Sequence, residues 1–430
     1  MNILMIANGW PPGSPGGVEV YVRRLALELA RNHEVRVFCR EADGSRPDYA
    51  LRNLDDGPLR VTMVNYNFGD FSDFAGTYFI RPMGEVFEKW LAETGRPEVA
   101  HVHHLGALGH SLVDVLDKCG VPVALTQHDF ALTCPRGQRI RDDYAICEKL
   151  NVEACLQCLK PQCQGGRSGL WKLYRYLFRK QAGRDMLHDF WTSSEKVANQ
   201  SRLILAPSEH HARRLEADGF PGGKILVMPY GYDPAPFREH QRGKIGLSRK
   251  FGYLGALIPS KGVHLLIEAF GLLANERPDL DLELHLHGPA PSYHGDSHYP
   301  AILKQMASGK RVTFHGPYRQ DELPGILQGL DALVMPSLWW ESHGMVIREA
   351  KLAGLPVIVT DHGAIGEAIT DGVNGLKVRP GDKSQIRDKM KILATTTGLA
   401  DTIASNPLKI KTISEDAKDH EALYRSLTKG

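Results

Sequence analysis

Two glutamates in this sequence are spaced so that both could meet one ligand. Glu341 stands in a tryptophan-rich loop after the apolar run 332–336, and Glu349 follows with seven residues between them. Gly344 would let the backbone turn, and residues 345–352 have the apolar spacing of a helix. The N–H groups at that helix start favour an anion. The pair suits an anionic, hydroxyl-rich ligand such as a nucleotide sugar, although a solvated surface helix would have the same pattern.

Two glycine-bearing loops each follow an expected strand. One contains Gly16 and Gly17 before an expected helix, without the G-x-G-x-x-G spacing of dinucleotide sites. Adjacent glycines there allow the backbone to approach a phosphate or a sugar. The other loop, residues 252–262, carries Lys261 beside a glycine and could place a positive charge on a diphosphate. Each could also be an ordinary loop, with Lys261 solvated.

The elements that would position these residues alternate between strand and helix. In the first half we expect strands at residues 3–7, 34–39, 61–65, 99–103, 121–126, 203–206 and 225–228, and helices at 20–31, 82–94 and 111–118. In the second half we expect strands at 251–254, 282–287, 312–315, 332–335, 357–360 and 376–378, and helices at 264–274, 321–329, 346–353 and 365–370. This alternation predicts an α/β fold with parallel sheets covered on both faces.

The length of 430 residues and the restart of the pattern near residue 250 predict two domains. The polar, proline-bearing stretch 232–243 lacks periodicity and reads as the linker. We expect an N-terminal, acceptor-side domain over residues 1–233, completed by a C-terminal helix at 414–430, and a nucleotide-sugar-binding domain over 234–413. Two such doubly wound domains would bind ligand at the carboxyl ends of their strands, in a cleft between them.

The composition is that of a globular protein and excludes several function classes. Hydrophobic residues make up 42% and charged residues 24% of the chain, and the formal net charge is +2. So small a charge gives no general attraction to nucleic acid, which is not an expected partner. No run of about 18 apolar residues is present, so we expect no membrane span. Residues 1–7 lack a basic lead and read as a first core strand, which favours a cytoplasmic location.

Five of the seven cysteines lie in an insert at residues 130–167 of the expected first domain. They are Cys134, Cys147, Cys155, Cys158 and Cys163. In a reducing compartment such a cluster favours metal over disulfides. The first four, which include one C-x2-C pair, form a plausible tetrahedral set for a structural zinc, with Cys163 as an alternative fourth ligand. An iron–sulfur cluster would use the same ligands, and thiols without metal are the other alternative.

Behind the insert, residues 170–180 are apolar at helical spacing with basic residues interleaved. Such a helix could lie on the inner face of a membrane and reach a lipid-linked acceptor. Packing against its own domain is the more common behaviour of a helix of this kind.

Taken in order, the motifs of this chain resemble those of the retaining nucleotide-sugar glycosyltransferases of glycosyltransferase family 4. The segments that carry the resemblance cover almost the whole chain and lie at residues 16–19, 101–103, 206–208, 228–233, 255–262, 341–349, 354–357 and 371–375. The set is specific because the two glutamates follow a Lys-Gly pair and precede a Gly-x-Pro-Val element. The resemblance implies the GT-B fold of two Rossmann-like domains.

The resemblance also implies a role for each donor-side residue. Glu341 would contact hydroxyls of the donor sugar and Glu349 those of the ribose. Lys261 would neutralise the leaving diphosphate, where charge develops in the transition state. The implied donor site comprises Gly16, Gly17, Lys261, Glu341, His343, Gly344, Met345, Val346 and Glu349.

His128 matches the family's first-domain histidine near the reacting centre. Its imidazole would hydrogen-bond the donor or help position the acceptor, and with Glu341 and Lys261 it completes the implied catalytic set. A histidine that caps a strand end is the alternative. His101 and His103 are expected to be structural.

Two positions depart from the family pattern. Ala256 stands where many members carry an arginine, so the cationic clamp on the diphosphate rests on Lys261 unless Arg348 or another residue substitutes. Ser342 and His343 replace the family's usual Pro-Phe after the first glutamate. Both departures lie on the donor side of the implied site.

The implied reaction transfers a hexose-type sugar from a nucleotide diphosphate, most simply UDP or GDP, to an acceptor hydroxyl with retention of configuration. The family's mechanism is metal-independent, and the leaving phosphate oxygen takes the acceptor's proton. The acceptor would be a glycan, as in polysaccharide biosynthesis, a lipid-linked sugar or a small molecule. The alternatives are a non-catalytic sugar- or nucleotide-binding protein, which Ala256 favours, and another reaction on this fold, such as sugar-nucleotide epimerisation.

Overall fold

The computed structural model divides the chain into two compact units, which are described one at a time. The described residues are 1–14, 16–68, 74–141, 143–159, 169–240 and 243–429, with only the backbone described for 74, 75 and 169–182. Unit 1 comprises Met1–Gln138, Glu148–Gly231 and Lys411–Gly430, and unit 2 comprises Arg139–Cys147 and Tyr232–Ile410. The sequence predicted domain boundaries after residues 233 and 413, and the structure has them after Gly231 and Ile410. The sequence prediction also placed the whole cysteine insert in the first domain, whereas Arg139–Cys147 groups with unit 2.

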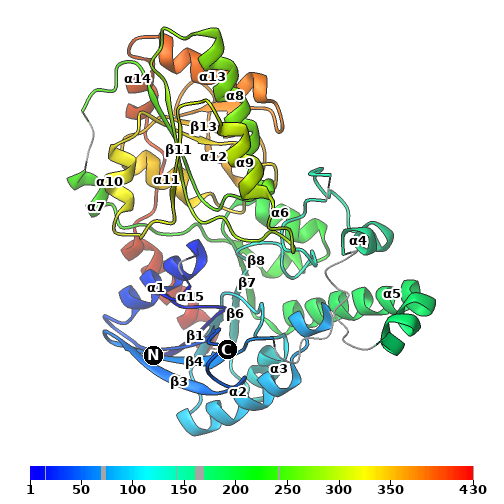
Figure 1. Ribbon diagram of the computed structural model, residues 1–430. Helices are drawn as coiled ribbons and strands as arrows, with labels where there is room; N and C mark the ends of the chain where they lie inside the picture. The colour runs from blue at the N-terminus through cyan, green and yellow to red at the C-terminus, as the bar shows by residue number, and fades with distance from the viewer. Residues whose placement is uncertain (15, 69–73, 142, 160–168, 241–242, 430) are drawn as a thin grey trace. The chain divides into compact units, whose positions relative to one another are not determined.

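Unit 1 is built on one eight-stranded sheet in the order β3-β4-β2-β1-β5-β6-β7-β8 (Figure 1). Its strands are β1 Asn2–Ala7, β2 Glu34–Glu41, β3 Leu51–Asp56, β4 Leu59–Asn65, β5 Val99–Val102, β6 Val123–Thr126, β7 Leu203–Ala206 and β8 Ile225–Val227. Neighbouring strands are parallel except β3 and β4. The central strand β1 is buried on both faces, which is why residues 3–7 read as a continuous apolar run.

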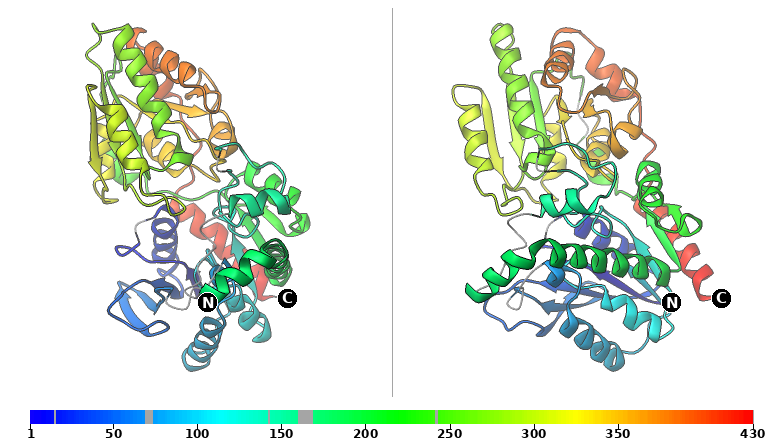
Figure 2. Two further views of the ribbon diagram at one scale, coloured as in Figure 1. Left: turned by 45° about the vertical axis from the view of Figure 1, so that its right-hand side comes forward. Right: turned by 90° about the vertical axis from the view of Figure 1, so that its right-hand side faces the viewer.

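Helices cover this sheet on both faces. They are α1 Gly17–Leu29, α2 Arg81–Thr94, α3 Ser111–Lys118, α4 Val152–Cys158, α5 Gly169–Gln200, α6 Glu209–Ala217 and α15 Ile413–Thr428. The C-terminal helix α15, red in Figures 1 and 2, lies beside α1 although the whole of unit 2 separates them in sequence. A capping box between Thr412 and Glu415 starts α15. Short 3-10 turns occur at Phe74–Thr77 and Gly222–Lys224.

Unit 2 is built on a six-stranded parallel sheet in the order β11-β10-β9-β12-β13-β14. Its strands are β9 Lys250–Leu254, β10 Glu283–His287, β11 Val312–Gly316, β12 Ala332–Met335, β13 Val357–Thr360 and β14 Leu376–Val378. Its helices are α7 Ala235–Glu239, α8 Val263–Glu276, α9 Tyr299–Ala307, α10 Leu323–Gln328, α11 Met345–Leu352, α12 Gly363–Ala368, α13 Lys383–Thr395 and α14 Leu399–Ser405. Helices α8 and α13 pack side by side on one face (Figure 1).

The strands and helices predicted from the sequence are confirmed within a few residues at their ends. The predictions missed β3, α4, α6, α7, α9, α13 and α14, of which α7 lies in the stretch 232–243 that was expected to be an irregular linker. Strand β3 escaped because its sequence, LRNLDD, alternates weakly and it pairs as an antiparallel edge strand. Most residues of helix α13 are polar or charged, so its apolar stripe is thin.

Strand order reverses once in each sheet, and the reversals decide where ligands can bind. In unit 1, β1 lies between β2 and β5; in unit 2, β9 lies between β10 and β12. In doubly wound sheets, loops that leave the carboxyl ends of two such neighbouring strands diverge and form a crevice. The loop after β9 carries Lys261 and the loop after β12 carries Glu341. The topology therefore places these two residues at the switch point of unit 2.

Within the described residues, no helix is long and apolar enough to cross a membrane. The basic, apolar segment 170–180 belongs to α5, but its side chains lie outside the described part of the chain. Its predicted membrane contact therefore stays a prediction.

Candidate functional site

The ammonium of Lys261 and the carboxylate of Glu341 are directly paired in unit 2. Lys261 Nζ donates to Glu341 Oε1 at 2.6 Å, and the side chains are 18% and 7% exposed. A pair this little exposed keeps more of its Coulomb energy than a surface pair. The two residues that the resemblance assigned to the diphosphate and the sugar thus form one charged unit at the switch point.

Two further donors, which the sequence did not single out, fix the same oxygen. Ser337 Oγ donates to Glu341 Oε1 at 2.7 Å and Trp339 Nε1 at 2.9 Å. Lys261 Nζ also lies 5.0 Å from the centre of the Trp339 ring, within cation–π distance. Within the described residues, these bonds all fall on Oε1, so Oε2 is the oxygen that can accept from a ligand hydroxyl. The only signal in the sequence was the richness of this loop in tryptophan.

The backbone around this pair depends on two glycines in left-handed conformation. Gly262 has φ +70°, and a β-carbon there would overlap the carbonyl oxygen of Pro336 at the end of β12. Gly344 has φ +72° and starts α11, where a β-carbon would overlap the side chain of Ile365. The first glycine lets the Lys261 loop approach the Glu341 loop, and the second directs the N-terminus of α11.

Glu349 lies on the buried side of α11 and is 3% exposed. Its Oε1 accepts from Gln320 Nε2 at 3.2 Å. Burial, and then the carboxylate of Glu349, raise the pKa of the neighbouring Tyr318. The second glutamate of the motif therefore lies near an amide and a phenol, the kinds of group that could share a pair of ribose hydroxyls with it.

Arg348, the candidate to replace the arginine that is absent at position 256, bonds the backbone of its own loop. Arg348 Nη1 donates to the carbonyl oxygens of His343 and, at 3.4 Å, Gly344. His343 is itself buried and stacks on Tyr232, with ring centroids 6.1 Å apart. At Ala256, the carbonyl oxygen accepts from Tyr253 OH at 2.8 Å. The described contacts thus give Lys261 no second cation, and Arg348 shapes the turn that carries His343.

In unit 1, His128 follows β6 and lies in a buried row of aromatic side chains. Its Nε2 lies 3.0 Å from His103 Nδ1, and its Nδ1 bonds the hydroxyl of Tyr230. Tyr21, from α1, stacks on Tyr230 with centroids 4.1 Å apart. Both nitrogens of His128 therefore have protein partners, and a ligand hydroxyl would have to compete with one of them.

Burial keeps the imidazoles of this row uncharged. It lowers the pKa of His128 to about 3, with a further contribution from His104. The pKa values of His101 and His103 are lowered well below the usual range, again chiefly by burial. His101 bonds Tyr424 OH at 2.6 Å and Thr126 Oγ1 at 2.7 Å, consistent with its expected structural role. His128 is thus a neutral donor or acceptor at physiological pH and no cation.

A second group of polar side chains in unit 1, His104, Asp129 and Glu19, was not predicted from the sequence as a site. His104 Nε2 and Asp129 Oδ2 lie 3.4 Å apart after β5 and β6, and Glu19 of α1 interacts electrostatically with both. Burial raises the pKa of Glu19. For His104, burial lowers the pKa, but Asp129 and Glu19 outweigh it, so that the net shift is upward. The group combines two carboxylates and an imidazole at the switch point of unit 1, and nothing in its spacing sets it apart in the sequence.

Gly16 and Gly17 lie at the start of α1 in the same region. Gly16 is the residue before the helix, and a β-carbon on it would overlap the carboxylate of Glu19. The glycine pair thus makes room for Glu19 as well as leaving backbone accessible to a ligand.

The described residues contain no group of three His, Cys, Asp or Glu side chains placed to hold a metal ion. Of the proposed zinc ligands, Cys147 belongs to unit 2, while Cys134, Cys155 and Cys158 belong to unit 1. Cys163 lies outside the described residues. Zinc binding remains a prediction that rests on spacing alone.

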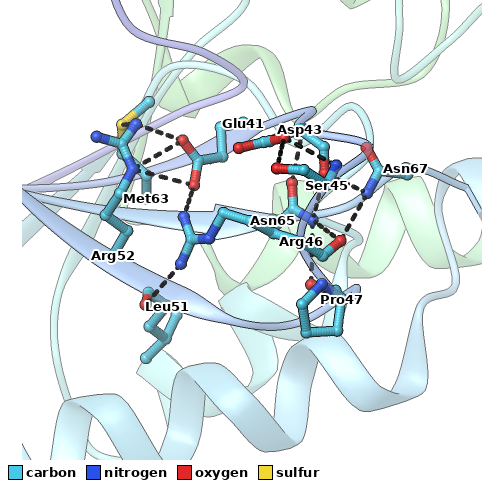
Figure 3. Close-up of polar contacts among 10 residues, drawn as sticks. All are labelled: Glu41, Asp43, Ser45, Arg46, Pro47, Leu51, Arg52, Met63, Asn65 and Asn67. Carbon is cyan, nitrogen blue, oxygen red and sulfur yellow. Dashed lines mark hydrogen bonds and ion pairs between the residues drawn. The ribbon is translucent and has the colours of Figure 1, made fainter.

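A further polar cluster lies at the carboxyl ends of β2 and β4 (Figure 3). Both Arg46 and Arg52 pair with Glu41. Asn65 Nδ2 donates to three carbonyl oxygens of the β2–β3 loop, those of Asp43, Arg46 and Pro47. The polar groups drawn here satisfy one another, so we assign the cluster to holding this loop in place.

Two doubly wound parallel-sheet units are the architecture of the GT-B fold, and solved structures with this fold match this chain. Anabaena HepE in complex with UDP and glucose matches with TM-score 0.66 and 19% identity, covering 99% of this chain and 100% of HepE. Sucrose-phosphate synthase from Thermosynechococcus elongatus matches with TM-score 0.69 and 19% identity, over 99% and 98% of the two chains. The predicted fold is thereby confirmed.

The comparison of sequences narrows the class to a family. The model described as "Glycosyltransferase Family 4" matches residues 15–236, and that described as "Glycosyl transferases group 1" matches residues 248–396. D-inositol 3-phosphate glycosyltransferase of Arthrobacter sp. (strain FB24) is 28% identical over 381 residues, which cover 85% of this chain and 79% of the relative. The chain belongs to glycosyltransferase family 4 and is a glycosyltransferase.

Proposed function

We propose that this glycosyltransferase moves a hexose-type sugar from UDP or GDP to an acceptor hydroxyl with retention of configuration. The observation that carries the proposal is the bond between Lys261 Nζ and Glu341 Oε1 at the switch point of unit 2. Glu341 can hold a sugar hydroxyl through its Oε2, while the ammonium of Lys261 faces the charge of a phosphate. A nucleotide sugar has these two groups on adjacent atoms.

In the proposed reaction, the bond between the sugar's anomeric carbon and the diphosphate oxygen breaks as a bond to the acceptor oxygen forms on the same face. The acceptor's proton passes to the leaving diphosphate oxygen, so the products are a glycoside and a nucleoside diphosphate. Lys261 stabilises the charge that grows on that oxygen. Glu349, with Gln320 beside it, holds the ribose, and neutral His128 hydrogen-bonds a substrate hydroxyl.

We propose that the acceptor is an uncharged polyol or glycan and that Glu19, Asp129 and His104 bind its hydroxyls. Carboxylates are strong acceptors for hydroxyl groups, and two of them would repel a phosphate at short range. The acceptor would then differ from the inositol phosphate in the name of the Arthrobacter relative. A lipid-linked acceptor and peripheral membrane contact remain compatible with this proposal.

The donor is tested by incubating the protein with UDP-, GDP-, ADP- and TDP-sugars and following thermal shift and nucleotide release. We expect a UDP- or GDP-sugar to stabilise the protein; stabilisation by none of the four would contradict the proposal. With the donor known, inositol and inositol 3-phosphate are compared as acceptors. Faster transfer to the phosphorylated form would contradict the assignment of Glu19 and Asp129.

A further inference from the structure

The carboxylate of Asp416, in the first turn of α15, is fully buried among donors from distant parts of unit 1. Its Oδ2 accepts from Tyr21 OH and from the N–H of Gly231, both at 2.9 Å. Its Oδ1 accepts from Lys411 Nζ at 2.9 Å and lies 3.2 Å from His420 Nδ1. Burial alone would raise the pKa of Asp416, but His420 and Lys411 outweigh it and lower the pKa. Asp416 therefore carries its charge.

Gly231 is packed so closely against Asp416 that no other residue fits. A β-carbon on Gly231 would lie 2.6 Å from Asp416 Cβ and 2.6 Å from the carbonyl oxygen of Thr412. Gly231 is also the last residue of unit 1 before the long segment Tyr232–Ile410 of unit 2, and Lys411 is the first residue after that segment. One side chain thus holds the unit 1 ends of the two connections to this segment.

The contacts of Asp416 continue to His128 through two tyrosines. Tyr21, which Asp416 fixes at its hydroxyl, stacks on Tyr230 at 4.1 Å. Tyr230 directly precedes Gly231, whose N–H Asp416 also holds, and its hydroxyl bonds His128 Nδ1. The ring of Tyr230 is therefore held from its face by Tyr21 and from its backbone by Asp416.

The bonds of this row also determine the tautomer of His128. His103 Nε2 is buried without a hydrogen-bond partner among the described residues. An imidazole N–H left unbonded costs more than a lone pair left unbonded, so the proton of His103 belongs on Nδ1, where it is donated to His128 Nε2. His128 then carries its own proton on Nδ1 and donates it to Tyr230 OH. His103 and Tyr230, the partners of the two His128 nitrogens, together fix this tautomer.

We propose that Asp416 is a positioning residue for His128, which it holds through Tyr21, Gly231 and Tyr230 in one orientation and in the Nδ1–H tautomer. The inference rests on the proposed function for the role of His128, but its structural part can be measured without any substrate. Asparagine cannot replace Asp416, because one of its two ends is an NH2 group and every group that faces this side chain is itself a donor.

The test is selective 15N labelling of histidine with long-range imidazole spectra, in which His128 is assigned from the signal missing in His128→Gln. We expect wild-type His128 to show a protonated Nδ1. In Asp416→Asn the two nitrogen signals should move toward the averaged values of mixed tautomers, and kcat should fall about tenfold to hundredfold at nearly constant donor KM. Tyr230→Phe should give the same change of tautomer, because it removes the acceptor itself.

The matched control is Asp419→Asn. Asp419 lies on the same helix and pairs with the same Lys411, at 2.6 Å, but its side chain is 56% exposed and touches neither Tyr21 nor Gly231. We expect wild-type spectra and kcat from it. If Asp416→Asn does not fold, Tyr21→Phe replaces it, since that variant loses one hydroxyl and keeps the stacked ring.

Unchanged His128 signals in folded Asp416→Asn, or in Tyr21→Phe where that variant stands in, would overturn the inference, as would equal changes in Asp419→Asn. If the wild-type protein transfers no sugar from any donor of the panel, the proposed function fails, while the spectra still decide whether Asp416 positions His128.

Discussion

Lys261 and Glu341, 80 positions apart in the chain, meet at 2.6 Å across the switch point of unit 2. Lys261 comes from the loop after β9 and Glu341 from the loop after β12, two strands that are hydrogen-bonded neighbours in the sheet. Ser337 and Trp339 hold the shared oxygen of Glu341 from the side. The pair is therefore preorganised, with its geometry set by the protein before any ligand arrives.

Replacing Glu341 with glutamine should remove most of the activity without unfolding the protein. The amide keeps the shape of the side chain but no longer balances Lys261 or accepts as strongly from a sugar hydroxyl. We expect kcat/KM to fall roughly 10²- to 10³-fold, measured as nucleoside diphosphate release with the donor found in the panel. Glu239→Gln, at an exposed glutamate of α7, is the control and should behave as wild type. Near-wild-type transfer by Glu341→Gln would mean that the site lies elsewhere.

Gly262→Ala should be more destabilising than the same change at a glycine of equal backbone conformation. Gly262 and Gly309 have φ of +70° and +73°, but a β-carbon meets Pro336 at Gly262 and nothing within 4 Å at Gly309. Gly309→Ala should lower the free energy of unfolding by about 1 kcal/mol, the cost of the left-handed conformation. Gly262→Ala should cost roughly 1–3 kcal/mol more through the steric overlap. Equal urea midpoints for the two variants would show that the β9 loop moves freely away from Pro336.

Acidification from pH 7 toward pH 5 should destabilise unit 1. Burial lowers the pKa of His128 to about 3 and those of His110 and His211 to about 4. Between these values and the unfolded pKa of about 6.5, the unfolded chain binds more protons, so stability is complete above pH 6.5 and is lost as the pH falls. Each such histidine contributes roughly 1.4 kcal/mol per pH unit at full slope. The pKa of His104 is raised instead, because Asp129 outweighs burial, so this residue favours the folded state as the pH falls. It is a single residue against three with a lowered pKa.

The measurement for this prediction is the urea midpoint at intervals between pH 7 and pH 5. His110→Gln should reduce the slope, because it removes one of the buried imidazoles while leaving a group that can bond Ser193, which His110 Nδ1 contacts at 2.8 Å. A midpoint that stays flat over this range would contradict the burial of these rings.

The zinc prediction is decided by metal analysis of protein purified without chelator. If the cysteine spacing is a metal site, at least about half an equivalent of zinc or iron should be found per chain, and Cys155→Ser should lose it. Cys119→Ser, at an exposed cysteine outside the insert, should keep it. Less metal than this in the wild-type protein would leave the four cysteines without a metal role.

Much of the fold and the donor side of the site could be predicted from the sequence because they depend on local patterns. Apolar runs gave the buried strands, such as residues 3–7, and helical spacing after Gly344 gave α11. The acidic pair Glu341 and Glu349 could be found because both lie on one continuous loop–helix segment. Strand β3 could not, since its identity depends on pairing with β4 and its own sequence is polar.

The sequence by itself determined the class of this protein, because the family's motifs are short, continuous and in a fixed order. Only the tertiary structure decided how the residues act together. The tertiary structure pairs Lys261 with Glu341 and places His104 beside Asp129. It also directs the Arg348 side chain toward carbonyl oxygens of the loop that precedes it. It also placed Asp416, from the far end of the chain, beside Tyr21. The Lys261–Glu341 and His104–Asp129 contacts join loops that follow different strands, and strand order, which no local pattern encodes, decides which loops are neighbours.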